Sequence, residues 1–198
     1  MTRADISDKL VHFTSPGDDW EEAYRRLKSI LSSQRIIAGN EKVKGRHLCV
    51  CFTEAPLLSL HGGLLNPTNY SRYSPFGVIF DKKWVFEKGG RPVIYQSEAE
   101  YYDLPESLRW RHVRYEPANS PAIDFSWERE WRIPCTELQF RSNEAAIIVP
   151  TSDWADRLIG EHEREQDYRV QMYSLVLDEF IAEQYRDHFP WRITVLGD

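Results

Sequence analysis

The clearest helical pattern in the chain lies between positions 19 and 31, where apolar residues recur every three or four positions. Asp18 or Asp19 can cap the start of this segment with its side-chain oxygen. Two glutamates follow in the first turn, where negative charge favours the helix dipole. This spacing and this start predict a helix that buries one face.

Most other apolar positions form short runs bounded by glycine, proline or polar residues, which is typical of strands. We expect strands at about 10–14, 48–53, 76–80, 92–95, 131–134, 145–149 and 191–196, with those at 131–134 and 145–149 as neighbours. Further helices are predicted at about 81–89, 154–162 and 177–188. Because helices and strands do not alternate regularly, the pattern favours an α+β fold.

A single domain accounts for the whole chain. Its 198 residues show no internal repeat and no low-complexity linker, and apolar residues make up 41% of them, which is enough to build a core. We therefore expect one domain over 1–198, with its core at about 10–150 and a helix and strand added at 151–198.

The formal net charge is −6, which argues against affinity based on covering phosphates with lysine and arginine. A local exception is the run 108–115, Leu-Arg-Trp-Arg-His-Val-Arg-Tyr, which could contact a nucleic-acid strand by stacking and charge or could be a solvated strand face. The three cysteines suggest neither a disulfide framework nor a zinc site. Without an apolar signal core or a membrane-length apolar run, we expect a cytoplasmic protein with no membrane contact.

Paired carboxylates are the sharpest local feature. In the segment 126–134, Ser-Trp-Glu-Arg-Glu-Trp-Arg-Ile-Pro, Glu128 and Glu130 would share one face of a regular strand. A cationic ligand or a raised carboxyl pKa would relieve their repulsion. The alternative is a solvated edge in which Arg129, Arg132 or a neighbour pairs with them.

Other candidates lie at the ends of predicted strands. His12 is flanked by apolar residues and can be a satisfied core histidine, and Thr14 beside it can be a turn or helix cap. Phe52 and Thr53 end the second predicted strand, where ligand-binding groups often lie, although Thr53 can equally cap the following turn.

A tyrosine-rich segment at 70–77 could stack on a planar ring. Tyr70 and Tyr73 are the candidates for stacking, and Gly77 would allow a backbone to approach closely. The alternative is that these tyrosines cover the edge of the core.

The order of these features resembles a group of bacterial proteins related to abortive-infection components of phage resistance, whose organisation is similar to the ADP-ribosyltransferase fold. The resemblance rests on His-x-Thr at 12–14, Cys-Phe-Thr-Glu at 51–54, a tyrosine, Gly-x-x-Phe at 77–80 and Trp-Glu-x-Glu-Trp-Arg at 127–132. It covers about 10–149 and is similar in outline to DNA-modifying toxins of that fold.

The resemblance implies a single α+β domain of two small mixed sheets around a cleft, with flanking helices and NAD as the ligand. His12 and Thr14 would contact the adenosine side of NAD, and Phe52 and Thr53 would support the cleft. Tyr73, or else Tyr70, would stack on nicotinamide near Gly77.

The same resemblance assigns the catalytic roles. Glu130 would bind the nicotinamide ribose and stabilise the oxocarbenium character that develops as the glycosidic bond of NAD breaks. Glu128 would orient the acceptor. The implied function is transfer of ADP-ribose to a protein, DNA or RNA acceptor in a bacterial or phage conflict, with a toxin or antitoxin as a further partner.

Two other functions remain open at the sequence level. The first is a non-catalytic, antitoxin-like module that uses the same fold to bind a nucleotide or a partner. The second is a nuclease that holds Mg²⁺ through Glu128, Glu130 and a further acid, which the lack of a clear aspartate partner disfavours.

Overall fold

The computed structural model describes residues 6–14, 19–56 and 74–197. Its strands are β1 (Lys9–Phe13), β2 (Arg35–Ile37), β3 (Cys49–Thr53), β4 (Gly77–Asp81), β5 (Arg91–Pro92), β6 (Ile94–Gln96), β7 (His112–Arg114), β8 (Glu130–Pro134), β9 (Glu137–Gln139), β10 (Ala145–Val149) and β11 (Arg192–Val195). Its helices are α1 (Trp20–Ser33), α3 (Lys82–Glu87), α4 (Ser152–Ser174) and α5 (Glu179–Glu183), and short 3₁₀ turns include η4 (Glu106–Arg111) and η5 (Ser126–Glu128).

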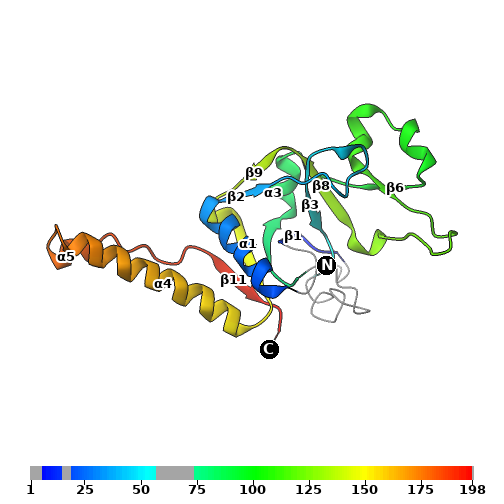
Figure 1. The fold of residues 1–198 in the computed structure, drawn as a ribbon. Coiled ribbons are helices and arrows are strands. Elements are labelled where there is room, and N and C mark those ends of the chain that lie inside the picture. The colour runs from blue at the N-terminus through cyan, green and yellow to red at the C-terminus, as the bar shows by residue number, and fades with distance from the viewer. Residues whose placement is uncertain (1–5, 15–18, 57–73, 198) are drawn as a thin grey trace.

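Seven of these strands form one mixed sheet in the order β11-β10-β4-β1-β3-β8-β5 (Figure 1). All neighbours are antiparallel except β10 and β11, which are parallel. The expectation that 131–134 and 145–149 are neighbours is wrong, because β4, β1 and β3 lie between β8 and β10. Their closeness in the chain does not decide their pairing, since β9 leaves the main sheet after β8 to pair with β2.

In the middle of the sheet, β1 and β3 pair through only one pair of residues. β1 pairs with β4 along its whole length, and β3 pairs with β8 along its whole length, but β1 and β3 are in register at Val11 opposite Thr53 alone. The sheet therefore consists of two parts, β11-β10-β4-β1 and β3-β8-β5, that are joined through this single pair. The mixed α+β class is confirmed. In place of two small mixed sheets around a cleft, the described residues form one seven-stranded sheet and two two-stranded sheets, β2-β9 and β6-β7.

One face of the sheet is closed by α1, as its apolar spacing predicts. Asp19 is the N-cap and accepts a hydrogen bond from the Glu22 backbone N–H at 2.9 Å. The buried face of α1 packs into a core with residues such as Leu10 and Phe52 from the sheet. The opposite face carries a smaller cluster around Val11, Ile79 and Ile148.

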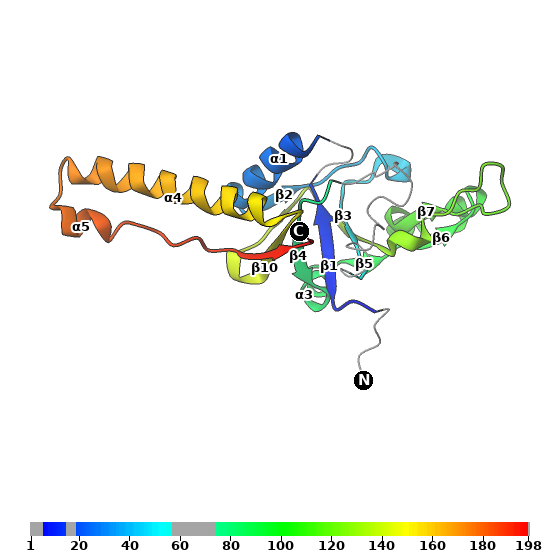
Figure 2. The same ribbon diagram turned by 90° about the horizontal axis from the view of Figure 1, so that it is seen from below.

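The carboxyl-terminal region projects from the body. α4 continues to Ser174, well beyond the predicted end, whereas the helix predicted at 177–188 is reduced to α5. The two helices form a hairpin, called the arm below, that lies at the opposite end of the molecule from β6 and β7 (Figures 1 and 2).

Candidate functional site

Glu130 begins β8 and is held by an arginine two residues further along the same strand. Arg132 Nε lies 2.7 Å from Glu130 Oε1, and Arg132 Nη2 lies 3.1 Å from Glu130 Oε2. Residues two apart in a strand share a face, so this two-pronged contact follows from the pleat. The cation that balances Glu130 is therefore supplied by the chain itself.

Arg132 is buried, with 4% of its side chain exposed. Its Nη1 also donates to the backbone carbonyls of Trp110 and His112, at 2.8 and 3.0 Å. Burial alone would favour the neutral guanidine, but the Glu130 carboxylate and its hydrogen bonds hold the pKa of Arg132 above its ordinary value. The contact is thus a buried ion pair that also fixes the orientation of the carboxylate.

The expectation that Glu128 lies beside Glu130 on one face of a strand is wrong. Ser126–Glu128 is a 3₁₀ turn, and Arg129 adopts a left-handed conformation with φ of 45° before β8 begins at Glu130. The turn is fastened by Thr53, whose Oγ1 donates to the Glu128 carbonyl at 2.5 Å. Thr53 also accepts a hydrogen bond from the Ala55 N–H, as expected for a residue that caps the following turn.

The two glutamates nevertheless line one pocket of about 300 Å³. It is lined further by Cys51, His112, Phe125 and Arg132, and by Lys42, Lys44, Glu98 and Arg114 at its polar side. Burial, followed by the charge of Glu130, raises the pKa of the Cys51 thiol, so this cysteine stays protonated.

His112 lines the pocket, and one of its ring nitrogens has no partner among the described residues. Its Nε2 contacts the Ser97 carbonyl at 3.0 Å and so carries the proton. Its Nδ1 is buried and has no hydrogen-bond partner among the described residues. A ligand in this pocket would meet the carboxylate of Glu130, held in place by Arg132, and the ring of Phe125.

In the described residues, His12 and Glu130 lie on opposite faces of the sheet, which corrects the expectation of one shared cleft. Thr53 lies opposite both Glu130 and Val11, so the side chains of Val11 and Glu130 point to the same face of the sheet. His12 is the next residue after Val11, so its side chain points to the other face. There its ring packs edge-on against Phe52. Its Nδ1 donates to the Cys51 carbonyl at 2.8 Å, in the gap where β1 and β3 diverge. Burial lowers the pKa of this imidazole below its ordinary value.

Three other expected contact residues have structural roles. Thr14 is buried, and its hydroxyl donates to the Ala23 carbonyl at 3.0 Å, which ties β1 to α1. Phe52 is 2% exposed and belongs to the main core. Gly77 faces β1, where an added Cβ would lie 2.6 Å from the His12 carbonyl oxygen, so the close approach is to a strand and not to a ligand.

Tyr70 and Tyr73 lie outside the described residues. The basic run at 108–115 is not a regular strand, because η4 occupies its first part. Its arginines bind within the chain: Arg109 donates to the carbonyls of Leu104 and Tyr102, Arg111 donates to that of Pro92, and Arg114 pairs with Glu116. A phosphate contact by this run would compete with these bonds.

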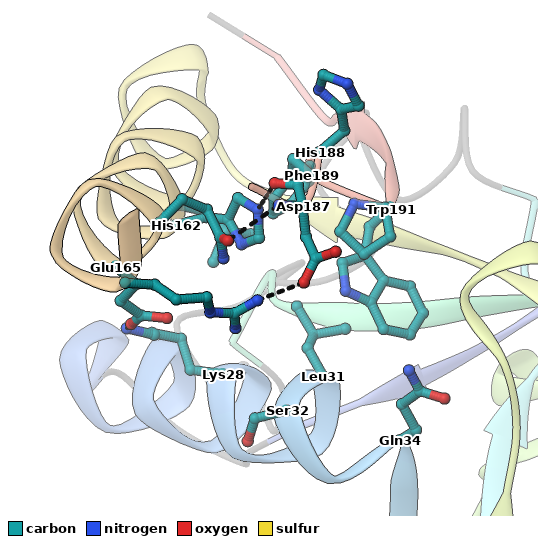
Figure 3. A pocket seen from close by; sticks show the side chains of 14 residues that line it. Lys28, Leu31, Ser32, Gln34, His162, Glu165, Asp187, His188, Phe189 and Trp191 are labelled. Atoms are coloured by element: carbon teal, nitrogen blue, oxygen red, sulfur yellow. Dashed lines mark hydrogen bonds and ion pairs between the residues drawn. The ribbon is translucent and has the colours of Figure 1, made fainter. Parts of the chain in front are cut away.

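A second pocket, of about 470 Å³, lies where the base of the arm meets α1 (Figure 3). Arg169 pairs with Asp187, and His162 Nε2 contacts the Asp187 carbonyl at 3.0 Å across it. Lys28 of α1 reaches Glu161 at 2.6 Å. These contacts tie the returning chain and α1 to α4, so the residues around the pocket have structural roles.

Sequence reasoning missed His112, whereas it named Arg132 as one alternative partner of the two glutamates. The spacing Glu-x-Arg predicts the contact between Glu130 and Arg132, because residues two apart in a strand point to the same face. No local pattern marks His112, which reaches the pocket through the pairing of β7 with β6.

Across the described ranges, no three His, Cys, Asp or Glu side chains are placed to hold a metal ion, and no described helix is long and apolar enough to cross a bilayer. Comparisons of the chain with protein-family models, with curated proteins and with solved structures found no match.

Proposed function

We propose that this protein is an NAD-using ADP-ribosyltransferase whose reacting carboxylate is Glu130. The supporting observation is the order of the strands that carry the resembling segments. β1 with His12, β3 with Thr53 and β8 with Glu130 are consecutive in the sheet, although they come from distant parts of the chain. Thr53 lies directly opposite Glu130, and its hydroxyl holds the turn that leads into Glu130 by donating to the Glu128 carbonyl.

The chemistry suits a fixed carboxylate. In the proposed reaction, the bond between the ribose C1′ and the nicotinamide nitrogen breaks, nicotinamide leaves with the bonding electrons, and an acceptor nucleophile bonds to C1′ as it loses a proton. Glu130, oriented by Arg132, would stabilise positive charge that develops on the ribose. Glu128, at the same pocket, would orient the acceptor.

The reacting end of the ligand would lie in the pocket that Glu128 and Glu130 line. His12 then acts through the protein, because it satisfies the Cys51 carbonyl where β1 and β3 diverge. The acceptor is a protein or a nucleic acid, and the setting is bacterial or phage conflict, as the sequence resemblance implies.

The experiment is incubation with NAD labelled in its adenylate phosphate, together with cell lysate, followed by measurement of transferred label and of NAD loss. We expect the Glu130→Gln variant to lose about 10²-fold or more of the transfer rate, the scale of removing one electrostatic stabiliser of a transition state. Glu137→Gln is the matched control, since Glu137 also lies in a strand and pairs with an arginine, Arg35, at the surface. Thermal unfolding of each variant shows that it is folded.

Equal transfer by wild type and Glu130→Gln would defeat the proposed mechanism.

A second function is favoured by one observation: Glu130 is already neutralised by Arg132, so the ion pair needs no ligand. This is the non-catalytic module, which binds a nucleotide or a partner. Saturable NAD binding without turnover by the wild-type protein would support it, and no binding at all would contradict an NAD site in either form.

A further inference from the structure

The segment 125–130, which carries both glutamates of the candidate site, is closed by one side chain from β6. The hydroxyl of Tyr95 donates to the Phe125 carbonyl at 3.3 Å and accepts a hydrogen bond from the Glu130 N–H at 3.1 Å. A tyrosine hydroxyl has one proton to donate and lone pairs that accept, so both bonds can form at once. Tyr95 therefore joins the first residue of this segment to its last.

The bridge keeps its form around neutral pH, because the hydroxyl keeps its proton. Burial raises the pKa of Tyr95 to about 12, and the negative charges of Glu130 and Glu128 also raise it. The Tyr95 hydroxyl can thus remain a donor to the Phe125 carbonyl while it accepts from Glu130.

The segment between these two ends needs support from outside, because it is neither a strand nor a full helix. It consists of the 3₁₀ turn η5 and of Arg129 in its left-handed conformation. Short 3₁₀ turns have poorer hydrogen-bond geometry than an α-helix. Thr53 holds the turn near its middle through the Glu128 carbonyl, and Tyr95 holds both of its ends.

The small sheet of β6 and β7 holds Glu130 in two ways. Tyr95 of β6 accepts from the backbone N–H of Glu130. Arg132 binds both carboxylate oxygens of Glu130 and donates to the carbonyl of His112, the first residue of β7. β6 and β7 are themselves paired, with Tyr95 opposite Val113. Backbone and side chain of Glu130 are therefore anchored to one unit.

The two residues that Tyr95 joins face the same pocket. Phe125 and Glu130 both line the pocket of about 300 Å³, and Tyr95 is not among its described lining residues. A ligand that touches both is placed correctly only if their relative position is fixed. Misplacing a reacting group by about 1 Å can cost about 10²-fold in rate.

We propose that Tyr95 is a positioning residue of the candidate site, which holds Phe125 and Glu130 in their relative places and acts on the reaction through Glu130. This inference rests on the proposed transferase function, because its effect is on the rate of that reaction. The bridge itself can also be measured without any activity.

The experiment is a double-mutant cycle on the transfer of label from NAD, with wild type, Tyr95→Phe, Glu130→Gln and the double variant. Tyr95→Phe keeps the ring and removes both hydrogen bonds. We expect it to lower kcat about tenfold and to change the KM for NAD by less than about twofold. In the Glu130→Gln background it should change the rate by less than about twofold, because the residue through which it acts is gone.

Tyr115→Phe is the matched control. The ring of Tyr115 lies next to that of Tyr95, with centroids 6.5 Å apart, but its hydroxyl does not join Phe125 to Glu130. The transfer rate of this control should stay within about twofold of the wild-type rate. Thermal unfolding of every variant measures how much of it is folded at the assay temperature.

Hydrogen exchange at the Glu130 amide measures the bridge directly. We expect this amide to exchange at least about tenfold faster in Tyr95→Phe than in the wild type, since it loses its acceptor. Unchanged exchange would show that the bridge does not form and would overturn the proposal whether or not the protein transfers ADP-ribose.

The transfer assay separates the remaining outcomes. Equal kcat for wild type and Tyr95→Phe would overturn the positioning role and leave the proposed function intact. An equal loss in the wild-type and Glu130→Gln backgrounds, or an unfolded Tyr95→Phe, would also overturn it, because Tyr95 would then support the fold as a whole. A wild-type protein that transfers no label would contradict the proposed function, and the positioning role together with it.

Discussion

At the scale of single residues, the pairing of Glu130 with Arg132 organises the candidate site. The guanidinium balances the carboxylate, fixes its orientation and also joins β8 to the backbone of the η4–β7 region. A buried pair of this kind does not necessarily stabilise a protein more than apolar residues would. Removing one partner is nevertheless costly, because the other charge remains buried.

We expect Arg132→Met to lower the free energy of unfolding by about 3–5 kcal/mol, because it leaves the Glu130 charge without its cation. The double variant Arg132→Met with Glu130→Gln should recover part of this loss, since the uncompensated charge is gone. Urea unfolding monitored by tryptophan fluorescence measures both. In the control Arg35→Met, which breaks the exposed pair with Glu137, the change should stay below about 1 kcal/mol. Similar losses in Arg132→Met and Arg35→Met would contradict a buried pair.

His12 gives the stability of the protein a dependence on pH. Its folded-state pKa is depressed by burial, so the folded protein prefers the neutral ring. The corresponding stabilisation is present above the unfolded pKa of about 6.5 and is lost as the pH falls through that value toward the folded-state pKa.

We expect the wild-type protein to lose more unfolding free energy between pH 7 and pH 5 than His12→Asn does. The asparagine amide can still donate to the Cys51 carbonyl but does not titrate. Urea unfolding at a series of pH values measures the difference. Parallel pH profiles for the two proteins would show that His12 is not the titrating group.

At the scale of the elements, the contact between β1 and β4 explains Gly77. The glycine lies opposite Phe13 in the register, and the backbone of His12 leaves no room for a side chain there. The glycine is thus required by the packing of two central strands. A ligand contact is not needed to explain it.

Gly77→Ala should destabilise the protein by about 1–3 kcal/mol, the range typical of overpacking. Gly39→Ala serves as the control, since an added Cβ at Gly39 meets no atom within 4 Å. Its effect should stay within about 1 kcal/mol. Thermal or urea unfolding compares them, and a neutral Gly77→Ala would mean that β1 and β4 can separate without cost.

At the scale of the whole molecule, the fold divides into a body with a well-packed sheet and an arm that projects from it (Figure 2). Near its start, α4 packs on the core through Ala155 and Leu158. Toward its end it contacts mainly α5 and the residues just after it, for example where Tyr173 and Tyr185 lie with ring centroids 4.5 Å apart. Local stability should therefore fall along the length of α4.

Hydrogen exchange can measure this gradient. In dilute protein, we expect backbone amides at 168–174 to exchange at least about tenfold faster than those at 156–162, because fewer buried contacts oppose local opening. Exchange followed by mass spectrometry or NMR resolves the two segments. Uniform protection along α4 in dilute protein would contradict the gradient.

Local sequence signals are sufficient for the features that depend on neighbours in the chain. The spacing of apolar residues and the Asp19 cap specify α1, and short β-prone runs specify β1, β3, β4 and β10, because these patterns act within a few residues. The mixed α+β class follows from the same local signals. The ends of α4 and α5 were less well predicted, since the arm lacks a clear apolar face against the core.

Tertiary structure alone decided which strands lie side by side and which side chains meet. The separation of β8 from β10, the role of Gly77 and the arrival of His112 beside Glu130 all depend on hydrogen bonds between segments far apart in the chain. The local spacing of apolar residues does not predict which strands pair. That spacing predicted strands at His12 and Glu130. The register of Val11 opposite Thr53, and of Thr53 opposite Glu130, puts the two side chains on opposite faces of the sheet.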